Sequence, residues 1–168
     1  MKTITLDIET TGLNPYYGDR ITCICAKDSS DGQKFSIIME DEKMILDYFF
    51  LWINTRKEGY QLISKNGKMF DLPFMYVRAM QVLKADWSFL FQYPHFDLSD
   101  ITYSKYISLD DIAKLYGLSG KNGNGKNAIK LWQDRKFAEL KEYCMHDVEL
   151  TEMIYKIYIK MVEDGKRK

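Results

Sequence analysis

The first 40 residues contain three short β-type segments separated by two turn-forming clusters. Residues 2–9 alternate apolar and polar side chains, and two further apolar segments lie at 20–28 and 33–39. The clusters between them, at 12–19 and 28–32, are rich in Gly, Asn, Asp, Ser and Pro. A period of two is typical of a half-buried strand, and these turn residues favour tight connections. The chain is therefore predicted to begin with a hairpin-rich sheet.

After residue 40 the pattern changes to helices that alternate with short strands. Apolar residues between Met44 and Trp52 fall near helical spacing, and Gly59 is a stop signal. The elements expected after this point are a helix from Glu40 to about Gly59, a strand at 60–67, a helix at 71–83, a short strand at 94–101, a helix at 108–118 and a helical stretch at 128–161. This order predicts one α/β domain over 1–168, with a mixed five-stranded sheet flanked by helices.

Composition limits the functional classes only in part. The chain has 24 basic and 24 acidic residues, so no global basic field indicates a nucleic-acid binder. A nuclease with a local basic rim stays possible, because bound metal ions supply positive charge at the site itself. The sequence shows no signal-peptide pattern and no apolar run of membrane-spanning length. We therefore expect a soluble, cytoplasmic protein with no membrane association.

The sequence does not decide the roles of the three cysteines and of one aromatic-rich stretch. Cys23, Cys25 and Cys144 show no zinc-ligand spacing, and an odd count is a poor disulfide framework. Cys23 and Cys25 lie in an apolar stretch and are expected to be small buried residues. The aromatic-rich stretch 85–96 is compatible either with core packing or with a partner surface.

The first segment with a chemical signature is the strand that carries Asp7 and Glu9. Residues two apart on a strand point to the same face, so both acids share one face while Leu6 and Ile8 share the other. Acidic residues are depleted in strands, and two like charges on one face repel unless something positive holds them. The alternative, two solvent-facing polar residues on an edge strand, is the weaker interpretation.

Two further segments carry weaker signals. Tyr143 and Asp147 are four residues apart, so on a helix they share one side. His146 is an alternative base, but it lies about a quarter-turn round the helix from Asp147. Asp71 follows an Asn-Gly turn and lies near the start of a helix, and by itself it is more readily explained as a helix N-cap or a first-turn acid.

Taken together, the three segments resemble the DEDD exonucleases of the DnaQ-like, ribonuclease H-like superfamily. The motif D-x-E-T-T-G stands at 7–12, N-x3-F-D at 66–71 and Y-x3-D at 143–147. The tyrosine indicates the DEDDy branch, since the histidine branch would need His where this chain has Glu142. The chain is most similar to the proofreading 3′–5′ exonuclease domains of family B DNA polymerases, including the segment 108–121. We expect a stand-alone version of such a domain, with a ribonuclease H-like fold.

The resemblance implies a two-metal hydrolytic site. Asp7, Glu9, Asp71 and Asp147 would hold two divalent ions, Mg²⁺ or Mn²⁺, and Tyr143 would orient the attacking water. The implied reaction is 3′–5′ removal of nucleoside monophosphates from single-stranded nucleic acid, with DNA favoured over RNA. Nothing in the sequence supports a polymerase or replication partner.

The resemblance also implies contacts to the substrate. The residues concerned are Thr10, Thr11, Gly12, Leu13, Asn66, Phe70 and Lys121, with Lys126 and Lys130 as further candidates for phosphate contacts. Leu13 and Phe70 are equally compatible with core packing, and the lysines with a solvated loop. An exoribonuclease of the same type and a non-catalytic nucleic-acid-binding module remain as alternatives.

Overall fold

A computed structural model of the chain describes residues 1–102, 104, 106–119 and 125–165, with the side chains of all of these except 125 and 126. Its centre is a five-stranded sheet of order β3-β2-β1-β4-β5. The first three strands pair antiparallel, and β4 and β5 run parallel to β1, so the predicted mixed sheet is confirmed. The strands are β1 Lys2–Thr10, β2 Ile21–Asp28, β3 Lys34–Ile38, β4 Tyr60–Ser64 and β5 His95–Asp97.

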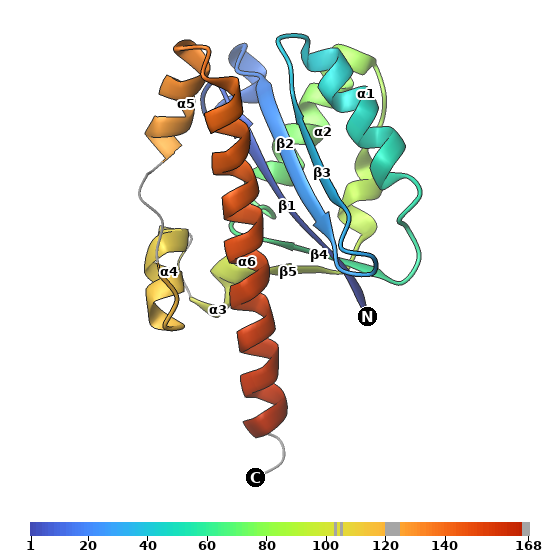
Figure 1. Ribbon diagram of the computed structural model, residues 1–168. Helices are drawn as coiled ribbons and strands as arrows, with labels where there is room; N and C mark the ends of the chain where they lie inside the picture. The colour runs from blue at the N-terminus through green and yellow to red at the C-terminus, as the bar shows by residue number, and fades with distance from the viewer. Residues whose placement is uncertain (103, 105, 120–124, 166–168) are drawn as a thin grey trace.

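Helices cover both faces of the sheet. The long helix α6 packs across β1 and β2, and its last turns extend beyond the sheet, whereas α1 and α2 lie on the opposite face (Figure 1). The helical elements are η1 Pro15–Tyr17, α1 Glu42–Ile53, α2 Asp71–Arg78, η2 Ala79–Leu83, η3 Ser88–Gln92, α3 Leu98–Ile101, α4 Leu109–Leu115, α5 Gly125–Gln133 and α6 Phe137–Gly165.

The alternation of β1 divides the interior into two layers. Leu6 and Ile8 are buried in the main core under α1 and α2, while Asp7 and Glu9, which alternate with them, are on the α6 face. The stretch 85–96 belongs mostly to this core, because Trp87 and Leu90 are fully buried, although Phe91 is half exposed. The predicted separation of apolar and acidic faces on β1 is therefore confirmed.

The predicted strand at 94–101 is wrong after its first half. The strand ends at Asp97, whose carboxylate accepts a hydrogen bond of 2.9 Å from the Ser99 amide and caps the short helix α3. A side chain that binds the backbone two residues ahead favours helix initiation over continuation of the strand.

Two predicted helices are also interrupted. The helix predicted at 71–83 is α-helical only through Arg78 and continues as the π-helical segment η2. The helical stretch predicted at 128–161 is two helices, and Arg135 in the connection has a φ of 57°, a left-handed conformation that no α-helix accommodates. The break allows α5 to fold back against α6.

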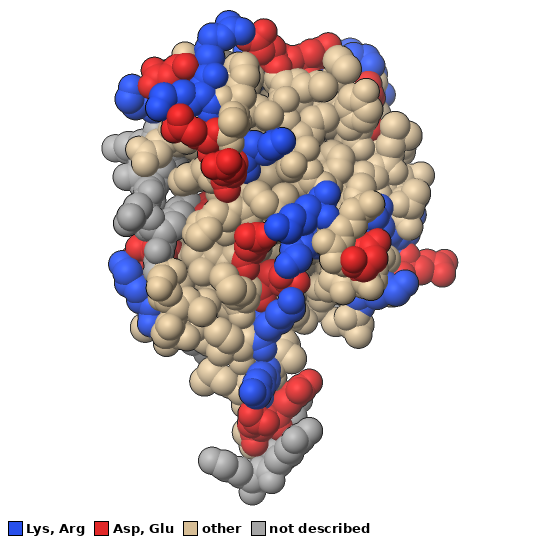
Figure 2. Space-filling view, in the orientation of Figure 1, with Lys and Arg blue, Asp and Glu red and all other residues tan. Residues whose placement is uncertain are grey.

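The surface carries mixed charge. In the view of Figure 2, Lys and Arg side chains alternate with Asp and Glu over α6 and do not gather into a single basic patch. Several are paired, as in Lys27 with Glu152 at 2.7 Å and Lys156 with Glu152 at 2.8 Å. In the part of the chain that the structure describes, no helix is both long and apolar enough to cross a membrane.

Candidate active site

The two acids of the first motif lie side by side on the α6 face of β1. Asp7 and Glu9 are both partly exposed, and in the antiparallel register they stand opposite Cys25 and Cys23 of β2. The register shifts directly after Glu9, so regular pairing with β2 is interrupted at the end of the motif. Irregularities of this kind re-aim side chains near functional sites. The strand thus presents both carboxylates on the face that α6 covers.

Asp71 reaches the same strand from the start of α2. Its Oδ1 accepts a hydrogen bond of 3.1 Å from the Ile8 amide. This position is available because β4 pairs with β1 only as far as Thr5, so the rest of that edge of β1 is open to a side chain. The amide that Asp71 binds belongs to the residue between Asp7 and Glu9, which brings the second motif onto the first.

The environment of Asp71 disfavours a bare negative charge. The residue is only 3% exposed, and burial raises the pKa of its carboxyl to about 7. The hydrogen bond from Ile8 opposes this rise, and the nearby carboxylate of Asp97 adds to it. A buried carboxyl close to other acids ionises readily only when a positive charge joins the group.

The third motif is carried by the face of α6 that packs on the sheet. Asp147 is 9% exposed and lies on this face with the buried Cys144. The Sγ of Cys144 is 3.6 Å from Oδ2 of Asp7, so this turn of α6 is in contact with the first motif. Tyr143 is partly exposed and borders a hollow of about 460 Å³ between α5 and α6. His146 is exposed, in agreement with its expected position away from Asp147.

The donor atoms fit divalent metal ions that prefer oxygen. Carboxylate oxygens of Asp7 and Glu9 lie within 4.8 Å of each other and of the Cys144 sulfur. Two carboxylates this close, with the buried Asp71 attached to the same strand, repel one another unless cations neutralise them. Oxygen-rich sites of this type suit Mg²⁺ and Mn²⁺.

The second motif is shaped by Asp97, an acid that the sequence reasoning missed. Its two carboxylate oxygens accept hydrogen bonds from the amides of Asn66 (2.7 Å) and Lys68 (3.0 Å), and Asn66 has a φ of 64°. Asn is one of the few residues that adopt this left-handed conformation readily. The side-chain oxygen of Asn66 is buried without a hydrogen-bond partner among the described residues. The D-x-S pattern at Asp97 is a capping signal that could have indicated this acid.

The predicted substrate contacts after Glu9 are tied into a tight loop. Thr10 donates a hydrogen bond of 2.6 Å to the Gly12 carbonyl, and the Thr11 hydroxyl accepts one of 3.0 Å from the Arg20 amide. A Cβ at position 12 would overlap the carboxylate of Asp19. Glycine is therefore needed here because the Asp19 side chain lies directly against the backbone of residue 12. The direct contacts of these residues to substrate stay predictions.

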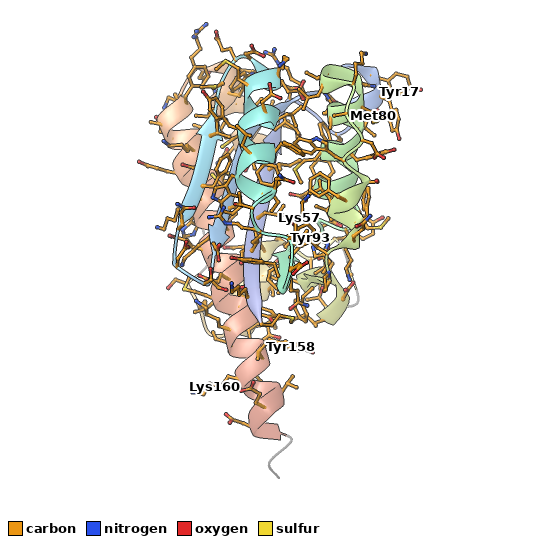
Figure 3. The ribbon with its side chains drawn as sticks, turned by 90° about the vertical axis from the view of Figure 1, so that its right-hand side faces the viewer. Tyr17, Lys57, Met80, Tyr93, Tyr158 and Lys160 are labelled. Carbon is orange, nitrogen blue, oxygen red and sulfur yellow. The ribbon has the colours of Figure 1, made fainter. Side chains whose placement is uncertain are left out.

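Three exposed apolar residues follow this loop. Leu13, Tyr16 and Tyr17 are 80%, 70% and 90% exposed, so core packing does not explain Leu13. Figure 3 shows Tyr17 at the same end of the molecule as Met80 of η2. Tyr16 and Tyr17 were not predicted from the sequence as substrate contacts, although aromatic residues between turn residues in a loop next to the first motif indicate a binding role.

The remaining predicted contacts are dispersed. Phe70 is partly buried and packs against Phe74 with ring centroids 5.4 Å apart. Lys130 lies on α5 and pairs with Asp134 at 2.8 Å. Lys121 lies outside the described residues, as does the side chain of Lys126.

The same arrangement of strands and helices is found within a solved DNA polymerase structure. The structure is similar to the family B DNA polymerase of the hyperthermophilic archaeon Pyrobaculum calidifontis, with a TM-score of 0.74 and 18% sequence identity. The match covers 90% of this chain and 23% of the polymerase chain. The ribonuclease H-like fold that the sequence predicted is thereby confirmed.

Sequence comparison identifies the family. Residues 14–164 match the model of a family described as a predicted 3′–5′ exonuclease related to the exonuclease domain of PolB, and the chain belongs to this family. The matched range includes Asp71, Tyr143 and Asp147 but begins after Asp7 and Glu9. A similar protein is the uncharacterized protein MJ0365 of Methanocaldococcus jannaschii, 30% identical over 171 residues that cover 92% of this chain and 93% of the relative.

Proposed function

We propose that this protein is a metal-dependent 3′–5′ exonuclease that removes nucleoside monophosphates from the 3′ ends of single-stranded DNA. One observation carries the proposal, which is the meeting of three distant motifs at one point of β1. The Asp71 carboxylate binds the Ile8 amide at 3.1 Å, and Cys144 of α6 touches Asp7 at 3.6 Å. Asp71 and the turn of α6 that precedes Asp147 therefore both reach the strand segment that carries Asp7 and Glu9, which supports one shared site for the four acids.

The four acids Asp7, Glu9, Asp71 and Asp147 are the residues that would hold two divalent ions. When bound, these ions would supply the positive charge that activates a water molecule and stabilises the leaving oxygen. The chain contributes the positioning of the acids, since the Ile8 amide orients Asp71 and the packing of α6 orients Asp147.

Tyr143 is the residue proposed to position the attacking water. It lies one helical turn before Asp147 and is partly exposed at the hollow between α5 and α6. A phenol can hydrogen-bond and orient a water molecule, and the four-residue spacing puts Tyr143 on the same side of α6 as Asp147. Its effect is therefore expected on turnover, with little effect on binding of the ions.

The exposed apolar residues after the first motif are proposed to hold the terminal nucleotides. Bases stack on aromatic side chains regardless of sequence, which suits a non-specific exonuclease. The loop that carries Tyr16 and Tyr17 is firmly held, because Oδ1 of Asn14 accepts a hydrogen bond of 3.0 Å from the Tyr16 amide. Arg78 of α2 also donates a hydrogen bond of 3.3 Å to the Pro15 carbonyl. We call Leu13, Tyr16 and Tyr17 the platform. Because it is formed before the substrate binds, little conformational entropy is lost on binding.

The experiment uses a 5′-labelled single-stranded DNA oligonucleotide, with a free or a blocked 3′ end, in the presence of Mn²⁺ or EDTA. We expect progressive shortening only with a free end and with metal. Asp7→Asn should abolish shortening, and Tyr143→Phe should slow it while Mn²⁺ binding stays intact. Asp164→Asn, which removes an exposed acid near the end of α6, is the matched control.

Three results would contradict the proposal. They are full activity of folded Asp7→Asn, cleavage of circular single-stranded DNA, and absence of shortening with every metal tried. Matched RNA oligonucleotides run in parallel distinguish the exoribonuclease, because that choice depends on contacts to the 2′-hydroxyl. Calorimetric titration with Mn²⁺ distinguishes the non-catalytic binding module, which would show no metal binding.

A further inference from the structure

The acids of β1 share their face with two thiols. The β1–β2 register places Cys25 opposite Asp7 and Cys23 opposite Glu9. Cross-strand partners point to the same face of a sheet, so two carboxylates and two thiols form one patch beneath α6. Cys144 lies over this patch and contacts Asp7.

The three thiols form a compact buried cluster. The Sγ atoms of Cys23 and Cys25 are 3.8 Å apart, and all three Sγ atoms lie within 4.8 Å of one another. Each cysteine is fully buried and none is in a disulfide. Only tertiary structure creates this group, because Cys144 is more than a hundred residues away from the other two in the chain.

We propose that Cys23, Cys25 and Cys144, with Asp7 as a fourth ligand, form a binding site for a thiophilic cation such as Zn²⁺. With Zn–S bonds of about 2.3 Å, two sulfurs of a tetrahedral site lie about 3.8 Å apart, and a sulfur and a carboxylate oxygen about 3.5 Å apart. The observed separations are 3.8 Å for Cys23 to Cys25 and 3.6 Å for Cys144 to Oδ2 of Asp7. The Asp7 oxygen lies within 4.8 Å of the Cys144 sulfur but does not form one such group with all three sulfurs, so its side chain would move toward Cys23 and Cys25 to complete the site.

The chemistry of the donors separates this site from the carboxylate site. Thiolates select Zn²⁺ and other soft ions, whereas carboxylates and water suit Mg²⁺ and Mn²⁺. On binding, each thiol loses its proton to the solvent and the cation replaces these protons. The partly exposed Asp7 offers a route from the solvent to the buried sulfurs.

Shared use of Asp7 gives the site a regulatory consequence. An ion held by the thiols would draw a carboxylate oxygen of Asp7 away from the hydrolytic ions. Zn²⁺ is therefore expected to inhibit the exonuclease. This consequence rests on the proposed function, whereas the existence of the thiolate site does not.

The test is an optical titration of the reduced full-length chain with Co²⁺, without oxygen. We expect near-ultraviolet thiolate-to-Co²⁺ absorption that saturates at one ion per chain. Zn²⁺ should displace it, and excess Mg²⁺ should not. Cys23→Ser, Cys25→Ser and Cys144→Ser should each weaken Co²⁺ binding about tenfold or more. Asp71→Asn, which leaves the thiols intact, should keep the absorption although it disturbs the carboxylate site.

Several outcomes would overturn the site. They are no thiolate absorption in the folded reduced protein, absorption unchanged by the serine variants, or a chain that purifies with two of these cysteines as a disulfide, two hydrogens lighter by mass. Inhibition of the exonuclease by Zn²⁺ is measured in a separate activity assay. There, active Cys25→Ser should need about tenfold more Zn²⁺ than the wild type for half-inhibition. Equal inhibition of both would place the inhibitory ion at the carboxylates and contradict the shared use of Asp7.

Discussion

Replacement of Asp71 by Asn should stabilise the metal-free protein at alkaline pH while it destroys activity. The folded state holds the Asp71 proton more tightly than the unfolded chain, because burial raises the carboxyl pKa from 3.8 to about 7. Its contribution to stability is therefore greatest at low pH and is lost as the pH rises from about 4 to about 7. The difference between the two pKa values corresponds to about 4 kcal/mol. Asn carries no charge and retains an oxygen that can accept the 3.1 Å hydrogen bond from Ile8.

The assay is thermal unfolding in EDTA of the wild type, Asp71→Asn and the control Asp164→Asn. We expect nearly equal stability of the first two at about pH 4, and a variant more stable by up to about 4 kcal/mol, or roughly 10 °C in Tm, at about pH 8. Mn²⁺ should then stabilise the wild type more than the variant. A difference that does not change with pH, or a variant less stable at both values, would refute the argument that burial penalises this charge.

Further variants test the platform, the second motif and the core. Tyr17→Ala should lower kcat/KM on single-stranded DNA about tenfold without a change in Tm, since one stacked base contributes about 1–3 kcal/mol, whereas Tyr48→Ala on α1 should have no effect. Gly67→Ala should reduce Tm and activity together, because a Cβ there would overlap the last residue of β4, while Gly165→Ala meets open space and should be neutral. Glu42→Ala should cost about 3–5 kcal/mol in urea unfolding, since it removes the buried carboxylate that pairs at 2.6 Å with Arg78, whose side chain is only 12% exposed. Stability unchanged by the last substitution would show that water replaces the lost partner.

The local parts of the site were accessible from sequence patterns. The alternation of β1 correctly predicted that Leu6 and Ile8 would be buried while Asp7 and Glu9 faced the other side. The helix predicted at 108–118 is present as α4, and its cap is local too, with the Ser108 hydroxyl accepting a hydrogen bond of 3.1 Å from the amide of the third helical residue. These features depend on neighbours within one or two turns, which the sequence contains in full.

The errors occurred where a few residues reverse a longer pattern. The helical spacing beyond residue 128 is continuous, yet the left-handed backbone of Arg135 divides it into two helices. The segment 94–101 begins with alternating apolar and polar residues, which is typical of a strand, but the Asp97 side chain starts a helix after three strand residues. In the first case the break allows α5 to pack against α6, and in the second a local capping hydrogen bond overrides the strand pattern.

The sequence by itself determined the identities of the acids, the faces that they share within each element and the class of fold. Tertiary structure decided how these elements meet. It brought Asp71 to the free edge of β1 because β4 stops pairing at Thr5, and it placed Cys144 against Asp7 because α6 crosses the same face. Contacts between distant segments depend on strand order and helix packing, which no local pattern encodes. The thiol cluster beside the acids is the clearest case, since no spacing of the cysteines along the chain indicated it.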